Sequence, residues 1–479
     1  MIFDQTGKVI SASQIEHAQI LPQSGWVEHD PLEILRATDH VIKTALQGAG
    51  LTGADLVAIG ITNQRETTLA WSAVTGAPLH NAIVWQDTRS QSILDKFDRP
   101  QREKISYKTG LPLAPYFSAS KMSWMLANCE AVKRAVEQQD LRFGTVDSWL
   151  VWNLSEENIH VTDVSNASRT LLMNLETLEW DDELLQAFGV PKESLGTIKS
   201  SSEIYGYTKV NGVFGARIPI AGIVGDQHAA LLGQLCFEKG ESKTTYGTGN
   251  FALINTGVEI IRSKKGLLTT LAFKLGDEPA KYALEGSVAV TGSAVQWLRD
   301  QLGIIQKSSD IEALAASVPT NGGVYFVPAF SGLFAPYWRG DARGVLVGLT
   351  RASTKAHIAR ATLEAICYQT HDVIRAMEEE TGVSIKVLRV DGGITQNQLC
   401  MQIQANILQT EVSRPIVSET TALGAAYAAG LAVGVWKNKE ELLSQWQESS
   451  RWFPLATAVE ASAGLKQWNK AIERSLNWI

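Results

Sequence analysis

Apolar and polar positions along the chain follow two periods, one typical of helices and one typical of buried strands. Helical spacing covers 357–379, 397–408 and the segment after Trp452, where Leu465, Trp468, Ile472 and Leu476 share one face. Short apolar runs of strand length separate the helical segments. We expect strands at 56–61, 81–85, 143–146, 218–224, 323–328 and 387–390. This alternation predicts an α/β architecture, with sheets flanked by helices.

The strand predicted at 218–224 breaks at Gly225 and brings Asp226 to the start of a helix. Ala229, Leu232 and Leu235 would form the buried side of that helix. An acidic side chain at the end of a strand is well placed to act as a general base, and the amides of a helix start favour anions. An aspartate at this position is more often a plain N-cap. Both interpretations predict Asp226 in the first turn of a helix.

A β-hairpin is predicted at 244–251, with its turn at Gly247-Thr248-Gly249. Glycines allow close backbone approach, and such a turn can present successive amides and a hydroxyl to phosphate oxygens. A single G-x-G turn is weak evidence and is more often purely structural. A general base and a phosphate-binding turn in one chain together predict phosphoryl transfer.

Length and charge limit the classes of protein to consider. With 479 residues the chain is longer than one hydrophobic core usually supports. The polar run 238–241 interrupts the apolar pattern, so we expect a boundary within 234–243 and two domains at 1–235 and 236–479. The net charge is −7 and no dense basic run occurs, which argues against a nucleic-acid partner.

Several features predict a cytoplasmic protein. No run approaches the ~20 apolar residues of a membrane span, and 424–436 is rich in Ala and Gly, as a packed helix would be. The amino end has no basic region leading into an apolar core, so no signal peptide is predicted. The four cysteines are scattered and lack the spacing of a metal site, which favours reduced thiols.

Motifs in both halves of the chain resemble the FGGY carbohydrate kinase family, and within it the branch that phosphorylates glycerol. In order they are SGWVEH at 24–29, ITNQRET at 61–67, IVWQ at 83–86, PYFS at 115–118, NASR at 166–169, GDQ at 225–227, YGTG at 246–249, PYW at 336–338, DGG at 391–393 and TALGAA at 421–426. So many motifs in the family's order make the signal specific. The resemblance implies two actin-like (ribonuclease H-like) domains with mixed sheets, which close over a cleft that holds ATP and glycerol. It also implies a homodimer or homotetramer.

The resemblance implies a glycerol pocket as well. Arg65 and Glu66 match the pair that exchanges hydrogen bonds with the hydroxyl groups, and Asp226 would take the proton of the attacking hydroxyl. The other matching residues are Trp85 and Phe251, which would pack on the carbon backbone, Tyr116, which would offer its hydroxyl, and Gln227, which would offer its amide. Without the resemblance, a solvated ion pair and ordinary core aromatics are the more common roles.

On the nucleotide side, the resemblance places Thr248 and Gly249 along the phosphates of ATP. Gly292 and Gln296 match positions near the nucleotide, although a helix start is their plain interpretation. The adenine-side pair would be Gly393 and Asn397. Mg²⁺ would ride on the ATP phosphates, with Asp226 as the one candidate protein ligand.

A loop at Gly215-Ala216-Arg217 lies near the position where bacterial members of the family bind the inhibitor fructose 1,6-bisphosphate. An exposed loop with a single arginine is the plain interpretation.

The sequence departs from the family pattern at its start. The family begins with a strand and an Asp-x-Gly-Thr-Thr-Ser turn, and neither precedes Met1 here. A short internal echo, 5–10 against 255–260, points to the same gap, although coincidence explains it equally well. We expect the neighbouring strand to have unpaired backbone groups, and the natural protein to begin further upstream. Two alternatives stay open: a related sugar or polyol kinase, and a chain that binds ligand without transferring phosphate.

Overall fold

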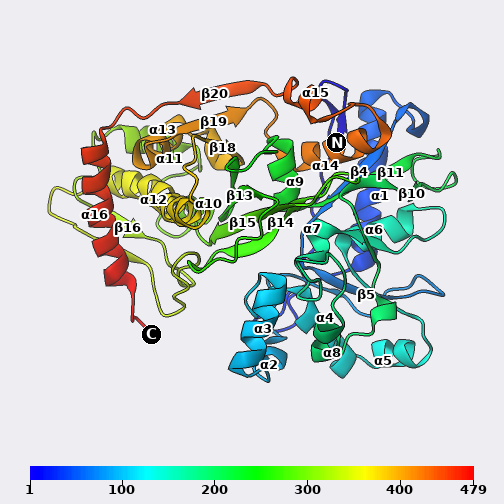
Figure 1. Cartoon of the computed structure of the whole chain (residues 1–479). Coiled ribbons are helices and arrows are strands. Elements are labelled where there is room, and N and C mark those ends of the chain that lie inside the picture. Colours follow the sequence, from blue (N-terminus) through cyan, green and yellow to red (C-terminus); the bar gives the residue numbers. More distant parts are fainter.

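A computed structural model describes all 479 residues and has the predicted α/β architecture (Figure 1). The first half contains β1 Ile2–Phe3, β2 Val9–Ser11, β3 Glu28–His29, α1 Pro31–Ala49, β4 Ile59–Asn63, β5 Thr68–Ser72, β6 Ala82–Ile83, α2 Gln91–Leu94, α3 Arg99–Thr109, α4 Ser118–Asn128, α5 Glu130–Glu137, β7 Leu141–Thr145, α6 Val146–Leu154, β8 Val161–Asp163, α7 Val164–Ala167, α8 Asp182–Phe188, β9 Thr197–Lys199, β10 Ser202–Tyr207, β11 Pro219–Gly225 and α9 Asp226–Gly233. The second half contains β12 Ser242–Tyr246, β13 Asn250–Gly257, β14 Leu268–Phe273, β15 Lys281–Val288, α10 Gly292–Asp300, α11 Asp310–Ala316, β16 Tyr325–Val327, β17 Val345–Val347, α12 Lys355–Thr381, β18 Val387–Asp391, α13 Gln398–Leu408, β19 Glu411–Pro415, α14 Thr420–Val433, α15 Lys439–Leu443, β20 Glu448–Trp452 and α16 Ala458–Ser475.

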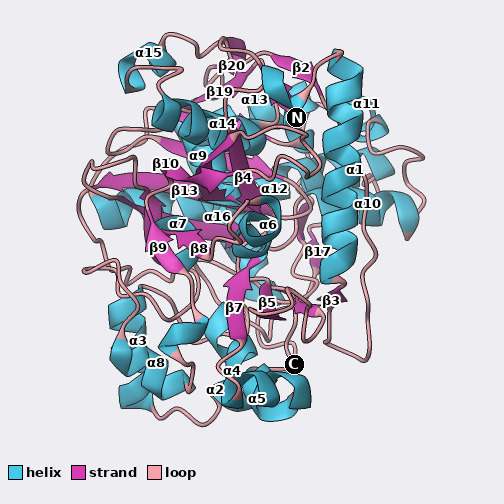
Figure 2. Cartoon of the chain, turned by 90° about the vertical axis from the view of Figure 1, so that its right-hand side faces the viewer, coloured by secondary structure: helices cyan, strands magenta, loops and turns pink.

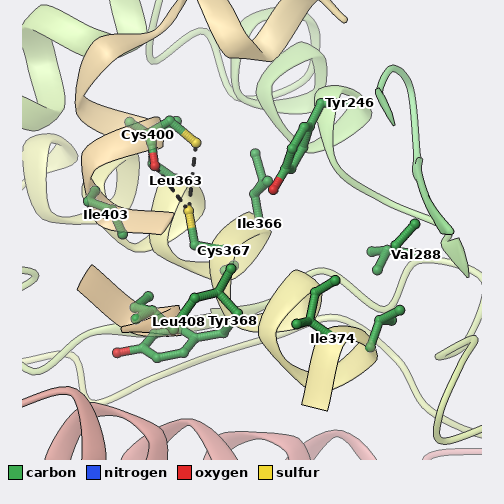
Figure 3. Close-up of a cluster of buried hydrophobic side chains, with 14 of the residues drawn as sticks. Tyr246, Val288, Leu363, Ile366, Cys367, Tyr368, Ile374, Cys400, Ile403 and Leu408 are labelled. Carbon is green, nitrogen blue, oxygen red and sulfur yellow. Dashed lines mark hydrogen bonds between the residues drawn. The ribbon is translucent and has the colours of Figure 1, made fainter. Parts of the chain in front are cut away.

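The second half is built on a seven-stranded sheet with the order β14-β15-β13-β12-β18-β19-β20. Strand β18 pairs in parallel with β12 on one side and β19 on the other, and the remaining pairs are antiparallel. Helices α12 and α13 bury their apolar sides in the largest core cluster, shown in Figure 3. Cys367 and Cys400 meet there with their sulfur atoms 3.7 Å apart and no disulfide between them.

The first half contains a three-stranded sheet, β10-β11-β4, and a four-stranded sheet, β3-β6-β5-β7. Figure 2 shows α4, α5 and α8 grouped beside β5 and β7. Helix α14, drawn in orange in Figure 1, comes from late in the chain but packs across β4, β11 and α9. A side chain at Gly60 or Gly222 would lie only 2.1 or 2.7 Å from the carbonyl oxygen of Ala425, so glycine lets this helix approach the sheet. The predicted packed helix at 424–436 is confirmed, although it ends at Val433.

Strand β4 pairs in parallel with β11 and has no strand on its other side. That side borders a cavity of about 710 Å³ lined mainly by apolar residues of β4, α1, α14 and the segment 1–5. In the second half, by contrast, β18 has a parallel strand on each side, β12 and β19. No helix is both long and apolar enough to cross a membrane.

The predicted elements are present with shifted ends. The strand expected at 56–61 begins at Ile59 because the exposed Val57 lies in a loop, and the strand expected at 81–85 is only the two-residue β6. Helices α12, α13 and α16 confirm the three helical segments. The glycines of the internal echo, Gly7 and Gly257, both have positive φ. No strand follows directly after Gly257, however, since β14 begins only at Leu268.

Candidate active site

Asp226 is the first residue of α9 and directly follows β11, as predicted. Its Oδ1 accepts a hydrogen bond from the amide of Gln227 at 2.7 Å, and its side chain is 34% exposed. The same oxygen lies 2.8 Å from Nε of Arg65, as an ion pair. A side chain at Gly225 would lie 2.8 Å from Cγ of Arg65, so the glycine makes room for the arginine beside the carboxylate. The end of β11 therefore presents one partly exposed carboxylate, which is held by a buried arginine.

Arg65 is shared between carboxylates from both halves of the chain. Its two terminal nitrogens donate to the carboxylate of Glu285 in β15, at 2.6 and 3.0 Å. Arg169 also donates to Glu285, at 3.2 Å, and its Nε donates to Glu66 at 2.6 Å. Arg65, Glu66, Arg169 and Glu285 are almost completely buried. The predicted Arg65–Glu66 pair is thus part of a four-residue network, and the solvated ion pair of the plain interpretation is wrong.

The network sets the charge of its members. Burial alone would raise the pKa of Glu285, but the guanidinium groups of Arg169 and Arg65 outweigh it and hold that pKa well below its usual value. For Glu66, burial outweighs the same two arginines and raises the pKa. Glu66 also has a φ of 60°, a left-handed conformation that costs a side-chain-bearing residue about 1–3 kcal/mol and that the surrounding network must hold in place. Its Oε1 is engaged by Arg169, and its other oxygen is the one that can accept from a ligand hydroxyl.

An aromatic wall adjoins the network. The rings of Trp85 and Tyr116 are 5.3 Å apart at 63°, and the Arg169 guanidinium lies 6.0 Å from the Tyr116 ring. Burial raises the pKa of Tyr116, so its hydroxyl stays protonated. Lys121, fully buried in α4, donates to the carbonyl oxygens of Pro115, Tyr116 and Phe117 at 2.6, 2.7 and 3.1 Å. This lysine fixes the backbone that presents Tyr116.

Gln227 and Phe251 meet at a second buried lysine. The Gln227 side-chain oxygen accepts from Nζ of Lys243 in β12, which leaves the amide NH₂ group free to contact a ligand. Phe251, at the start of β13, is partly exposed, and its carbonyl oxygen lies 3.4 Å from the same Nζ. Both residues therefore lie in the region between α9 and the hairpin.

The hairpin turn is formed as predicted, and it packs on the start of α10. Within the turn the amide of Gly247 donates to the carbonyl of Gly249 at 2.8 Å, so this amide is not offered to a phosphate. Gly292 donates to Gly247 at 3.1 Å, and a side chain at Gly292 would lie 2.5 Å from that carbonyl oxygen. Thr248 is exposed, as is Gln296 one helical turn after Gly292. The predicted phosphate-side residues are thus brought together.

The adenine-side pair reaches the same region through Gly392. This residue has a φ of 90°, and a side chain there would lie 2.3 Å from the carbonyl oxygen of Tyr246 at the end of β12. Gly393 is exposed and begins a short 3₁₀ helix. Asn397 caps α13 by accepting from the amide of Cys400 at 2.8 Å. The side-chain oxygen of Asn397 is therefore engaged, and its amide NH₂ group is the part that can contact a ligand.

Comparison with known proteins gives the family. Residues 1–233 match the N-terminal domain of the FGGY family of carbohydrate kinases, and residues 243–433 match its C-terminal domain. The chain belongs to the FGGY family of carbohydrate kinases. Its fold is accordingly the two-domain, actin-like FGGY kinase fold.

The relatives of this FGGY kinase include proteins named glycerol kinase. Glycerol kinase 1 of Streptomyces coelicolor is 58% identical over all of this chain and 96% of its own length, and glycerol kinase of Mycobacterium tuberculosis is 57% identical over all of this chain and 94% of its own. The crystal structure of Plasmodium falciparum glycerol kinase with ADP superposes with a TM-score of 0.92 at 37% identity, covering 99% of this chain and 95% of that one. A xylulose kinase of Lactobacillus acidophilus has the same fold, with a TM-score of 0.86 at 24% identity, covering 98% of this chain and 94% of that one.

The FGGY kinase chain contains no cluster of three or more His, Cys, Asp or Glu side chains arranged to bind a metal ion. Both contacts of Asp226 fall on Oδ1, so Oδ2 remains for other partners. A single carboxylate oxygen fits Mg²⁺ that is held mainly by phosphates and waters, and does not fit a dedicated protein site.

The loop at Gly215–Arg217 lies on the surface. Gly215 has a φ of 65° and is exposed. The Arg217 guanidinium stacks 3.6 Å from the Tyr207 ring and pairs with Glu156 at 3.3 Å. An anion bound here would have to compete with Glu156.

Arg169, Glu285, Lys243 and Lys121 are functional candidates that the sequence interpretation of this FGGY kinase missed. Arg169 lies in a recognised motif but received no role. Glu285 is the one acidic residue of β15, and Lys243 is the one charged residue of β12, whose other residues are Ser, Thr and Tyr; a charge at a strand position is the only signal that marks them. A charge buried in a strand must be paired, so such positions point to a partner elsewhere in the chain.

Proposed function

We propose that this FGGY kinase transfers the γ-phosphoryl group of ATP to glycerol and forms sn-glycerol 3-phosphate. The observation that carries the proposal is the arrangement around Asp226, a partly exposed carboxylate held by Arg65, with the aromatic pair Trp85 and Tyr116 joined to the same ion-pair network. The glycerol kinases at 57–58% identity over the whole chain support glycerol as the acceptor. The ADP in the Plasmodium falciparum structure supports ATP as the donor.

In the proposed reaction Asp226 accepts the proton of one glycerol hydroxyl. The resulting oxygen forms a bond to the γ-phosphorus, the bond from that phosphorus to the bridging oxygen breaks, and ADP leaves with the electron pair. Arg65 orients Asp226 through its ion pair, and Glu66 accepts from a second hydroxyl. Trp85 and Phe251 cover the carbon backbone, and Tyr116 and Gln227 add polar contacts.

On the donor side, Thr248 and Gly249 lie along the phosphates, beside Gly292 and Gln296, and Gly393 and Asn397 lie on the adenine side. Mg²⁺ bound to ATP would neutralise charge on the phosphates, and Oδ2 of Asp226, which has no other partner, would be the protein oxygen available to it. We place the two domains at 1–235 and 236–479. They would close on the substrates and exclude water, since an open site would hydrolyse ATP.

The proposal also covers the cellular location, the oligomeric state and the regulation of the protein. We expect a cytoplasmic homodimer or homotetramer, with Cys367 and Cys400 kept as thiols. Fructose 1,6-bisphosphate would act at Gly215 and Arg217 by displacing Glu156. A sedimentation measurement with and without the bisphosphate tests both statements, and an Arg217→Ala variant should no longer respond.

Glycerol-dependent ADP formation from MgATP tests the function itself. The wild-type chain should turn over glycerol in preference to xylulose and gluconate. An Asp226→Asn variant should lose about 10²–10⁴-fold in kcat and still bind glycerol in a calorimetric titration. Asp182→Asn, which breaks an exposed pair with Lys192, is the matched control and should be unchanged. Near-normal turnover by Asp226→Asn would refute the base assignment. Turnover of a sugar in place of glycerol would refute the assignment of glycerol as the acceptor. Ligand binding without any phosphoryl transfer would refute the proposed kinase activity.

A further inference from the structure

A fully buried ammonium group stands where the two halves of the site meet. Lys243 lies in β12, and its Nζ donates to the side-chain oxygen of Gln227 and, at 2.9 Å, to the hydroxyl of Thr245. The third acceptor is the carbonyl oxygen of Phe251, 3.4 Å away in β13. One ammonium has three N–H donors, so these three acceptors use all of them.

The three acceptors come from different parts of the proposed site. Gln227 follows Asp226 in α9, whereas Thr245 and Phe251 are opposite each other on the two strands of the phosphate hairpin. Lys243 therefore ties the helix of the proposed base to the strands that carry the Gly247–Gly249 turn. No other side-chain hydrogen bond joins Gln227 to that hairpin.

The sheet register explains why Lys243 points to α9. Lys243 is opposite Leu253, and Leu253 is opposite Glu285, so the three residues form one row across β12, β13 and β15. Residues opposite each other in a sheet share a face. Leu253 packs with Ala229 and Leu232 of α9 on that face. Lys243 and Glu285 are thus presented to α9 from either side of Leu253.

Charges from both halves surround the ammonium. Burial lowers the pKa of Lys243 to about 8, while Asp391, Glu285 and Asp226 oppose that change and Arg65 adds to it. The ammonium form therefore still dominates at neutral pH. Its charge balances the acids, which is the purely structural role that any buried lysine could have.

We propose that Lys243 is a positioning residue for phosphoryl transfer, which holds the acceptor side of the site in register with the phosphate hairpin through Gln227. This inference rests on the proposed function. A displacement of about 1 Å between the reacting groups can cost about 100-fold in rate, so loss of this tie should reduce kcat.

The test compares Lys243→Met, which keeps the length but removes the donors, with Lys243→Arg, which keeps the charge. Lys243→Met should lose about 100-fold in kcat and raise the KM for glycerol, with little change in the KM for ATP. Lys243→Arg should recover part of the loss. Lys239→Met is the matched control, because Lys239 is exposed and pairs only with Glu259 at 2.6 Å. It should match the wild type.

A purely structural role predicts a different pattern. Lys243→Met would then lower Tm and the active fraction and leave both KM values of the folded protein unchanged, which would overturn the proposal. If Lys243→Met does not fold, Thr245→Val removes one acceptor without changing shape, and wild-type kcat and KM in that variant would also overturn it. Failure of the wild type to turn over glycerol would instead refute the proposed function, so the two failures are distinguishable.

Discussion

Replacement of Glu285 by Ala would remove the centre of the buried ion-pair network. The carboxylate accepts hydrogen bonds from Arg65 at 2.6 and 3.0 Å and from Arg169 at 3.2 Å, and the side chain is only 1% exposed. Arg65 and Arg169 are 2% and 0% exposed, so water would replace these bonds only by entering the space left by the Glu285 side chain. Each arginine would keep one carboxylate, since Arg65 still contacts Asp226 and Arg169 still contacts Glu66.

The carboxylates that remain, Asp226 and Glu66, limit the loss of stability in Glu285→Ala. Loss of one partner of a buried pair costs about 3–5 kcal/mol, and the partial compensation favours the lower end, about 3 kcal/mol. For a domain of this size that loss lowers Tm by about 6–12 °C. Glu259→Ala is the control, because its pair with Lys239 is largely exposed and contributes less than about 1 kcal/mol.

Thermal unfolding followed by circular dichroism at several pH values measures the effect. The two arginines hold the pKa of Glu285 below its unfolded value, so its contribution is complete above the ordinary carboxylate range and is lost only as the pH falls through the lower folded pKa. The difference in Tm between wild type and Glu285→Ala should therefore be constant near neutral pH and shrink in strong acid. A Tm equal to that of the Glu259→Ala control at pH 7 would refute the role of the network.

Two further predictions concern the phosphate turn and a second buried lysine. Gly249→Val should reduce ATP-dependent turnover by at least about tenfold, because a side chain there would lie 2.5 Å from the carbonyl oxygen of Val288 and displace the turn. Gly340→Val is the control for the added bulk, because Gly340 has open space around it and no positive φ, and wild-type turnover by Gly249→Val would contradict the prediction. Burial lowers the pKa of Lys121 to about 7 in the folded chain. Between that pH and the pKa of an unfolded lysine, the side chain is protonated mainly in the unfolded chain. The contribution of Lys121 to the free energy of unfolding should therefore rise with pH. Lys121→Met should flatten the rise of Tm between pH 7 and about pH 10, and an unchanged slope would contradict this assignment.

The sequence predicts the immediate surroundings of Asp226 because they are local. An apolar run, a glycine and an amphipathic helix occur in direct succession, and β11 and α9 begin and end within a residue or two of the expected positions. The hairpin at Gly247–Gly249 is predicted for the same reason. Strand ends such as those of β4 and β6 are less accurate, because tertiary pairing decides where a strand stops.

The ion-pair network is not predictable in this way. Glu285 lies 220 positions from Arg65 and 116 from Arg169, and no periodicity connects residues that far apart. A sequence pattern relates a charged residue only to its neighbours in the chain, so Arg65 is the one ion-pair partner it suggests for Glu66. In the structure its closest partner is Arg169, at 2.6 Å against 3.9 Å for Arg65.

Register links these distant charges to the fold. Lys243 and Glu285 lie on either side of Leu253 in one row, and the face of that row meets α9. A slip of one residue in either strand pair would turn a charge toward the opposite face of the sheet, where Ala252, Ile254 and Leu284 belong to the apolar core. An unpaired charge in that core would cost several kcal/mol, so the misregistered sheet is strongly disfavoured. The residues that orient Asp226 and Gln227 therefore also specify the register of β12, β13 and β15, and a substitution at either position should affect the geometry of the site and the pairing of the sheet together.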